Sequence, residues 1–401
     1  MTRHGRRGRL GRNMFANHFI LPLSPIHKFT PPPSFLPETK MTIISNTQTE
    51  NCPPVVSAVL ALRNEERYVG TVLKSLLQQE TSNFELEIIV VDGDSTDSTQ
   101  AIVKRVAGAD YRVKLAINRQ KKTPYAFNLG IQAARGEYIC ILGAHTVYAR
   151  DYIATCLEEL KVQGAHGCSG REVTRPGSDG TQARLVAWAL AHPFGTSTGS
   201  MRTRGTGFAD TISYPIYLKS TLLEVGGYDT RLHRNQDNDL NQRLRARGYK
   251  LYITDKTSCE YFVSRSVASL VRYAFKTGAW NVISFKSNRA SMAIRHFVPG
   301  AFVMALFLSL GAYLFSVGKT GDIRWWLRSP LLLLAAVYGI ASIAAACHVS
   351  FRERSVRALF LPLLFLVLHV SYGVGTVWAM ISGMRPPTSE FNQGREVVEP
   401  S

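Results

Sequence analysis

The chain has 401 residues, of which 45% are hydrophobic, so it is long enough for two or three structural units. Its formal net charge of +18 is spread over both ends and the middle of the sequence. Because this excess is not gathered with aromatic residues on one segment, it disfavours nucleic-acid binding and suits a protein that lies beside anionic lipid and handles a phosphorylated substrate.

Both ends of the chain are expected to be polar tails. Residues 1–50 open with the basic run MTRHGRRGRLGRN and continue into three consecutive prolines, a composition that predicts disorder. The apolar run FANHFILPL is interrupted by Asn17 and His18 and therefore does not fit a signal peptide. Met41 is a second candidate for the start of the protein, and residues 385–401 form the other tail.

Residues 51–262 are predicted to form an α/β domain. Four apolar runs have the length and composition of strands: 55–62, 85–93, 114–118 and 137–144. Amphipathic helical spacing falls between them, at 67–79, after DSTDST to about 106, and at 123–134. In the last of these helices, Thr123 is the expected cap and Pro124 the first residue. Repeated βα units of this kind predict a doubly wound, mostly parallel sheet.

Two segments after this alternation have distinctive compositions. Residues 195–207, GTSTGSMRTRGTG, are rich in small residues and predict a mobile functional loop or an ordinary surface loop. Within 263–296, apolar residues at 267, 270, 271, 274, 275 and 278 form one stripe of a helix. This helix is expected either to lie in a membrane interface or to pack against the domain.

Residues 297–384 are predicted to contain three transmembrane helices. The apolar segments 297–318, 329–349 and 357–383 each reach the length of about 20 residues that a span requires. Basic residues gather before the first segment and between the second and third, which places the catalytic domain in the cytoplasm of an inner or plasma membrane. Six cysteines without a CxxC pair agree with free thiols in a reducing compartment.

The ends of three predicted strands carry polar side chains. The first strand runs into Arg63-Asn64-Glu65-Glu66, the second into Asp92-Gly93-Asp94, and the fourth into Gly143-Ala144-His145. Ligands bind at the carboxyl ends of strands in open α/β sheets, so these residues are expected to form one site. Further along, Asp237 and Asp239 fall in the first turn of a predicted helix, where the helix dipole favours an ionised carboxylate.

This set of motifs resembles the family 2 glycosyltransferases of the GT-A fold, in particular the membrane-associated succinoglycan type of glucosyltransferase. The resemblance covers about 55–260 and includes VGGYD at 225–229 and RNQDNDLNQRLRARGYKLY at 234–252. It implies that Asp237 is the catalytic base. It also implies a set of substrate-binding residues, with Asp92 holding a uracil ring: Asn64, Glu65, Asp92, Asp94, Lys121, Asp229 and Asp239.

One element departs from the family's pattern. An Asp-x-Asp metal-binding element is expected after the fourth strand, but the sequence reads Gly143-Ala144-His145. His145 is therefore the candidate metal ligand for Mn²⁺ or Mg²⁺, since imidazole suits a transition metal better than Mg²⁺. Alternatively, Arg202, Arg204, Arg272 or Lys276 could neutralise a diphosphate without a metal, although for these four a solvated or lipid-facing position is the default.

The sequence leaves several functions open. The leading hypothesis is an inverting enzyme that moves a hexose from a UDP-sugar to a lipid-linked saccharide in exopolysaccharide or cell-surface glycan synthesis. The alternatives are a transferase that acts on polyprenyl phosphate and a catalytically impaired subunit that binds nucleotide sugars. A nicotinamide-dependent dehydrogenase is disfavoured, because NEERYVG and not a glycine-rich phosphate loop follows the first strand.

Overall fold

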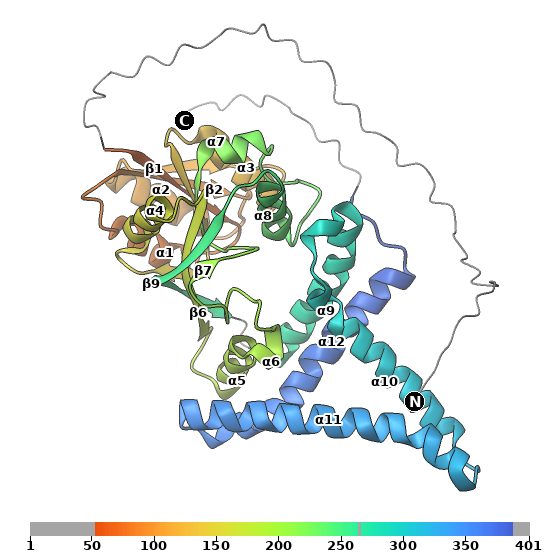
Figure 1. Cartoon of the computed structure of the whole chain (residues 1–401). Helices are drawn as coiled ribbons and strands as arrows, with labels where there is room; N and C mark the ends of the chain where they lie inside the picture. Colours follow the sequence, from red (N-terminus) through yellow and green to blue (C-terminus); the bar gives the residue numbers. More distant parts are fainter. Residues whose placement is uncertain (1–52, 264–265, 388–401) are drawn as a thin grey trace, which may run out of the picture. The chain divides into compact units, whose positions relative to one another are not determined.

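The computed structural model describes residues 53–263 and 266–387 (Figure 1). The predictions for residues 1–50, for Met41 as a start and for most of the C-terminal tail lie outside these ranges. Within them, the catalytic region and the C-terminal helices belong to one compact unit.

Nine strands form one mixed sheet, and eight of them have the order β3-β2-β1-β4-β8-β6-β9-β5. The strands are β1 (Val55–Leu62), β2 (Glu85–Asp92), β3 (Val113–Ile117), β4 (Tyr138–Gly143), β5 (Thr146–Tyr148), β6 (Gly167–Pro176), β7 (Gly207–Phe208), β8 (Ile216–Leu218) and β9 (Leu251–Val263). The four strands predicted from apolar runs, β1 to β4, are mutually parallel. Beyond β4 the sheet is mixed, because β8 runs antiparallel to both β4 and β6.

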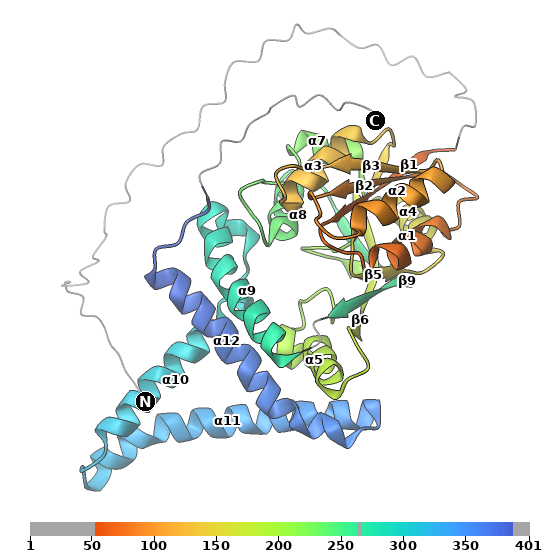
Figure 2. The same ribbon diagram turned by 180° about the vertical axis from the view of Figure 1, so that it is seen from behind.

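Eight helices accompany this sheet: α1 (Val69–Leu77), α2 (Thr99–Ala109), α3 (Thr123–Ala133), α4 (Tyr152–Val162), α5 (Thr181–Ala191), α6 (Pro193–Thr196), α7 (Lys219–Glu224) and α8 (Gln236–Ala246). α3 has its proline in the first turn, as predicted, but its N-cap is Lys122 and not Thr123. α1, α2 and α4 lie together on one side of the sheet (Figure 2). The core on the other side contains residues of α3, α7 and α8.

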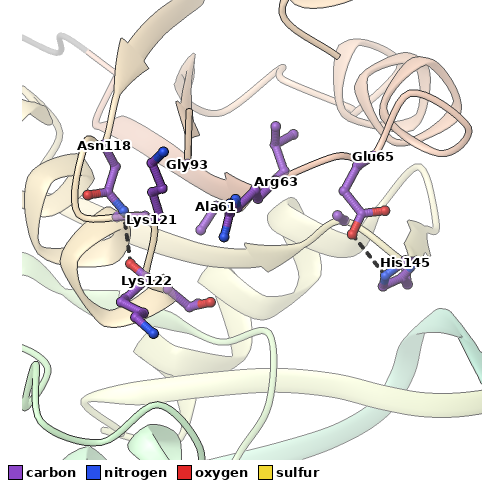
Figure 3. A pocket seen from close by; sticks show the side chains of 12 residues that line it. Ala61, Arg63, Glu65, Gly93, Asn118, Lys121, Lys122 and His145 are labelled. Carbon is purple, nitrogen blue, oxygen red and sulfur yellow. Dashed lines mark hydrogen bonds and ion pairs between the residues drawn. The ribbon is translucent and has the colours of Figure 1, made fainter. Parts of the chain in front are cut away.

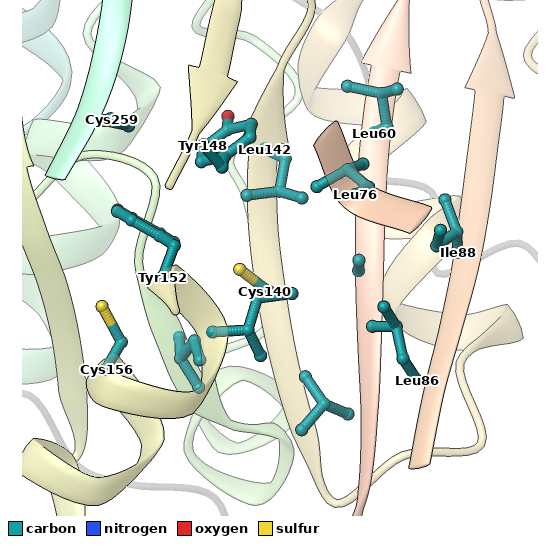
Figure 4. Close-up of a cluster of buried hydrophobic side chains, with 14 of the residues drawn as sticks. Leu60, Leu76, Leu86, Ile88, Cys140, Leu142, Tyr148, Tyr152, Cys156 and Cys259 are labelled. Carbon is teal, nitrogen blue, oxygen red and sulfur yellow. The ribbon is translucent and has the colours of Figure 1, made fainter. Parts of the chain in front are cut away.

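The two cores are built from alternate residues of the same strands. Leu60, Ile88 and Leu142 point to the side of α1 and α4, where Leu76 and Tyr152 pack against them (Figure 4). Val59, the neighbour of Leu60, belongs to the opposite core. Both sides of these strands are therefore dry, which is why the strands are continuous apolar runs in the sequence.

The parallel register brings the carboxyl ends of the strands to one edge. Leu62 at the end of β1 is the partner of Asp92 on β2, and Ala61 is the partner of Gly143 on β4. Asp92 in turn pairs with Ile117 at the end of β3. The loops that follow these strands must therefore meet in space, as the sequence predicted.

The C-terminal region contains α9 (Val267–Ser287), three short 3₁₀ helices and three long apolar helices. The short ones are η1 (Arg289–Ser291), η2 (Ile294–His296) and η3 (Val356–Phe360), and the long ones are α10 (Val298–Phe315), α11 (Gly321–Glu353) and α12 (Leu361–Ile381). The segments Val298–Phe315, Gly321–Glu353 and Val356–Ile381 are long and apolar enough to cross a membrane. α11 extends well beyond the predicted 329–349 and accommodates Pro330 within the helix.

α9 packs closely along α12 (Figures 1 and 2). A Cβ atom added at Gly278 would lie 2.0 Å from the carbonyl oxygen of Tyr372, and one added at Gly375 would lie 2.1 Å from that of Phe275. These glycines therefore allow the two backbones to touch. Leu270, in the predicted apolar stripe, is buried in the core that joins α5, α11 and α12. Leu270, Ala274 and Gly278 of this stripe are therefore buried within the protein, whereas Val271 is exposed.

Candidate active site

A pocket of about 240 Å³ opens at the strand edge (Figure 3). The ends of β1, β2, β3 and β4 and the start of α3 contribute its lining residues: Ala61, Leu62, Arg63, Glu65, Gly93, Asn118, Lys121, Lys122, Thr123, Ala126, Ala144 and His145. Three cationic side chains, Arg63, Lys121 and Lys122, stand against the single carboxylate of Glu65. The pocket is therefore electropositive and suits a phosphorylated ligand.

Asp92 does not line this pocket, contrary to the role that the resemblance implied. The residue is fully buried, and its carboxylate accepts hydrogen bonds from the Ser95 amide, the Ser95 hydroxyl and the Gln100 side chain. These bonds hold the turn after β2 and leave the carboxylate no open face toward a nucleobase. The next residue, Gly93, forms the pocket wall at this strand end.

Asn64 and Asp94 also hold the turns around the pocket. The Asn64 side chain accepts a 2.8 Å hydrogen bond from the amide of Thr96, which joins the loops after β1 and β2. Asp94 forms a 2.7 Å ion pair with Lys121, and the charge and hydrogen bond of Lys121 lower the pKa of Asp94. Of these three residues, Lys121 alone lines the pocket, so a ligand phosphate would compete with Asp94 for it.

Glu65 and His145 lie next to each other on one side of the pocket, opposite Lys121 and Lys122 (Figure 3). Glu65 Oε1 lies 3.0 Å from His145 Nε2, and the edge of Tyr68 packs against the imidazole. Two neighbouring ligands of an octahedral ion with bonds near 2.1 Å stand about 3 Å apart, so this pair fits two positions of one divalent ion. Across residues 53–263 and 266–387, no third His, Cys, Asp or Glu joins them, and a metal here would need oxygens from the bound substrate or water.

Asp237 lies in the first turn of α8, as predicted. Burial raises its pKa to about 6, against the opposing effect of a hydrogen bond with Tyr228, and the negative charge of Glu172 adds to the rise. The chain enters α8 through Asn235, which has a positive φ of 60°. A carboxyl group with a pKa near 6 is ionised at neutral pH and still basic enough to accept a proton from a hydroxyl group.

A buried cluster connects Asp237 to the strand edge, and its members were not singled out in the sequence as catalytic candidates. Glu172 on β6 is buried and accepts hydrogen bonds from Arg202 at 2.8 Å and from Ser213 at 3.0 Å. Next to Ser213, the ring of Tyr214 covers Gly143, where an added Cβ would lie 2.7 Å from Tyr214 Cε1. Tyr214 has a φ of 52°, a conformation that costs free energy in a bulky residue.

Arg202 is therefore not free to neutralise a donor diphosphate. Its guanidinium is largely buried in the ion pair with Glu172 and also lies over the ring of Tyr261. Arg204 donates a hydrogen bond to the carbonyl oxygen of Phe208 on β7. The segment predicted as a mobile loop is thus tied to β6 and β9, and the default of a solvated position is wrong for Arg202.

Asp229 and Asp239 are occupied by protein partners. Burial opposes the ionisation of Asp229, but the hydrogen bonds and charge of Arg231 outweigh it and hold the Asp229 pKa below its usual value. The Asp239 carboxylate is buried and accepts hydrogen bonds from Arg243 at 2.8 Å and Asn288 at 2.9 Å. These contacts give no support to a substrate-binding role for either residue.

The described chain is similar in fold to a solved glycosyltransferase. The mannosyltransferase PcManGT from Pyrobaculum calidifontis, solved in complex with GDP-Man and Mn²⁺, superposes with a TM-score of 0.50 at 19% sequence identity. The similarity covers 81% of this chain and 88% of that one. The mixed α/β sheet, with an electropositive pocket at its parallel edge, has the GT-A fold of glycosyltransferases.

The sequence comparisons show which proteins the chain is similar to. Residues 57–219 match the family model described as glycosyl transferase family 2. Two curated relatives are each 24% identical over 79% of this chain: succinoglycan biosynthesis protein ExoA of Rhizobium meliloti, and dolichyl N-acetyl-alpha-D-glucosaminyl phosphate 3-beta-D-2,3-diacetamido-2,3-dideoxy-beta-D-glucuronosyltransferase of Methanococcus voltae. These matches span 92% and 95% of the relatives' lengths. These comparisons support a glycosyltransferase whose residues 57–219 are similar to family 2.

Proposed function

We propose that this enzyme is an inverting transferase that moves a hexose from a nucleoside diphosphate sugar to a lipid-linked saccharide during exopolysaccharide or cell-surface glycan synthesis. The observation that carries the proposal is the position of Asp237. Asp237 is a half-buried residue whose carboxyl group has a pKa of about 6, and Glu172 and Tyr214 connect it to the edge that holds the electropositive pocket.

The reaction divides the work between these two regions. The donor diphosphate lies in the pocket against Arg63, Lys121 and Lys122, whose charges stabilise the departing nucleoside diphosphate. Asp237 accepts the proton of the acceptor hydroxyl, whose oxygen attacks the anomeric carbon from the face opposite the diphosphate. A new carbon–oxygen bond forms as the bond to the diphosphate oxygen breaks, so the configuration at the anomeric carbon inverts.

A divalent cation, Mn²⁺ or Mg²⁺, fits this proposal as a cofactor. His145 and Glu65 would hold it on the side of the pocket formed by the ends of β1 and β4. When bound, it would neutralise charge on the diphosphate. The three cations in the pocket supply the same kind of stabilisation from the protein itself.

Three features support a lipid-linked acceptor. The chain carries three helices that could span a membrane, and α9 joins the first of them to the sheet. The Methanococcus voltae relative is named for a dolichyl-phosphate-linked sugar, and the Rhizobium meliloti relative for succinoglycan synthesis.

The basic residues favour a catalytic domain on the cytoplasmic side of an inner or plasma membrane. With this topology, protease added to intact spheroplasts would spare the domain. Cleavage there would contradict the topology.

A donor screen in native membranes tests the function, with and without Mn²⁺ and a chelator. Transfer of labelled sugar from a nucleoside diphosphate donor into lipid extracts is the expected result, with uridine donors the first to test. The contacts of Asp92 do not support the uridine assignment. A preference for guanosine or cytidine donors would therefore correct the proposed donor nucleotide but would not contradict the proposed reaction. Absence of transfer from every donor would favour the catalytically impaired subunit.

The related transferase that uses polyprenyl phosphate is separated by its acceptor chemistry. A phosphate oxygen is already anionic and needs no base, so Asp237→Asn would retain transfer to that acceptor. An acceptor hydroxyl group does need the base, and the same substitution would abolish transfer.

A further inference from the structure

Three arginines gather where the catalytic domain meets α9 and α12, and we call Arg202, Arg234 and Arg295 the arginine cluster. They come from the loop after α6, from the segment before α8 and from η2, which are far apart in the sequence. Within the described residues, Arg202 has an ion-pair partner, Glu172, whereas Arg234 and Arg295 form no ion pair with a carboxylate. Positive charge is therefore in excess at this junction.

Arg234 is held at the junction without being neutralised. Its guanidinium donates a 3.2 Å hydrogen bond to the Thr277 hydroxyl and lies 5.3 Å from the centre of the Tyr273 ring. Both contacts are with α9, and both leave donors of the guanidinium fork unused. Arg234 also lies in the segment that leads into α8, three residues before Asp237 along the chain.

Arg295 approaches the same place from the other end of α9. Its guanidinium packs against Gly199, where an added Cβ would lie 3.2 Å from Arg295 Cζ. The neighbouring carbonyl, that of His296, faces the Asn281 side chain at 3.4 Å. Asn281 lies one helical turn from Thr277 and also accepts a hydrogen bond from the side chain of Asn235, the neighbour of Arg234, so the segments that carry Arg234 and Arg295 meet at the same part of α9.

Tyrosine rings complete the enclosure. Arg202 lies over Tyr261, Arg234 over Tyr273, and Tyr372 of α12 makes a hydrogen bond with Asn281. Rings that stack on guanidinium groups hold them in place without consuming their hydrogen-bond donors. The site is therefore arranged to present oriented N–H groups to something that the protein itself does not supply.

We propose that the arginine cluster binds the phosphate or diphosphate of the lipid-linked acceptor, with Arg234 and Arg295 making the contacts and Arg202 positioned by Glu172. This inference rests on the proposed function and adds the group by which the acceptor is recognised. The guanidinium fork matches phosphate oxygens in pairs, and the adjacent apolar helices suit the lipid chain.

Binding of the full-length protein to phosphatidylcholine vesicles tests the site without any need for turnover. Vesicles doped with polyprenyl diphosphate should bind more tightly than vesicles doped with an equal charge of phosphatidylglycerol. Arg234→Gln and Arg295→Gln should each weaken binding to the polyprenyl diphosphate vesicles roughly tenfold or more, because charge-assisted hydrogen bonds are lost. Arg289→Gln is the matched control, since Arg289 is exposed on η1 nearby and its substitution removes the same charge.

The results separate the cluster from general attraction to the membrane. Equal weakening by Arg289→Gln, or equal binding to phosphatidylglycerol vesicles, would overturn the proposal. Inorganic pyrophosphate that displaces the protein at concentrations similar to the lipid would reassign the site to a soluble anion and overturn it too. If a glutamine variant fails to fold, judged by nucleotide binding, Arg295→Lys retains the charge and should lose the paired contact only.

This experiment and the donor screen can fail independently. One outcome is that Arg234→Gln loses polyprenyl diphosphate binding while the unmodified protein transfers no sugar. This outcome would support the lipid site and contradict the proposed reaction. Sugar transfer by the unmodified protein, with unchanged lipid binding in both variants, would support the proposed reaction and contradict the lipid site.

Discussion

The side chains around the donor pocket come from one stretch of sequence between residues 61 and 145. Their positions depend on β1 to β4, four parallel strands whose ends pair in register. The side chains that act on Asp237 come from more distant segments: Glu172 from β6, Tyr217 from β8 and Tyr228 from the turn after α7. The pocket is open and its ion pairs are exposed, whereas the ion pair near Asp237 is largely buried.

This difference teaches where electrostatic effects can be large. Exposed pairs such as Lys121–Asp94 are screened by water and can be exchanged for a ligand at little free-energy cost. Burial around Asp237 removes that screening, so one charge there alters both the pKa of the base and the stability of the fold. Mutations should therefore have smaller effects at the donor pocket than near the base.

The largest effect is expected for Asp237→Asn. Loss of the general base should lower kcat by about 10²–10⁴-fold while nucleotide binding is retained, which transfer assays and titration calorimetry would measure. Asp255→Asn, at an exposed position, is the control.

The Asp237→Asn substitution should also change thermal stability. A carboxyl group whose pKa is raised by folding destabilises the fold as it ionises, so Asp237→Asn should raise Tm at pH 7 and not at pH 4. A fully active variant would remove Asp237 from the mechanism.

Glu172→Gln should show that the two acidic groups are coupled. In the unmodified enzyme, kcat should rise with pH through about 6 and then level off, because Asp237 must be ionised. Removing the charge of Glu172 should move this midpoint downward, by up to about one pH unit. Stability should fall by about 3 kcal/mol, since Arg202 loses its buried partner. An unchanged midpoint in a folded variant would contradict the coupling.

A moderate effect is expected for His145→Ala. If His145 and Glu65 hold a divalent ion, the variant should require about 10–100-fold more Mn²⁺ for half-maximal activity, with Tm nearly unchanged at the half-exposed position. Manganese titrations of transfer activity would measure this. Unaltered activity in a chelator, in both proteins, would show that the pocket cations suffice.

The smallest effect is expected for Lys121→Met. Its ion pair with Asp94 is exposed, so stability should change by less than about 0.5 kcal/mol. KM for the donor should rise severalfold while kcat changes little, because the charge contacts the diphosphate before and during transfer. A loss of kcat as large as that in Asp237→Asn would contradict the expectation of smaller effects at the donor pocket than near the base.

The sequence by itself determined the elements whose signals are local. The apolar run at Val55–Leu62 became a buried parallel strand, and the two acids near the start of α8 occupy its first turn. Three apolar segments became helices of membrane-spanning length. In each case the burial of a repeating apolar pattern, or the start of one helix, decides the outcome within a few residues.

Only the tertiary structure decided which polar groups remain available to a ligand. Asp92 has the sequence context of a ligand-binding acid, yet Ser95 and Gln100 occupy its oxygens. Arg202 has the context of a loop cation, yet Glu172, thirty positions away, neutralises it. A side chain's charge can be read from the sequence, but its free donors and acceptors depend on partners that distant segments bring to it, because hydrogen bonds act over only a few ångströms.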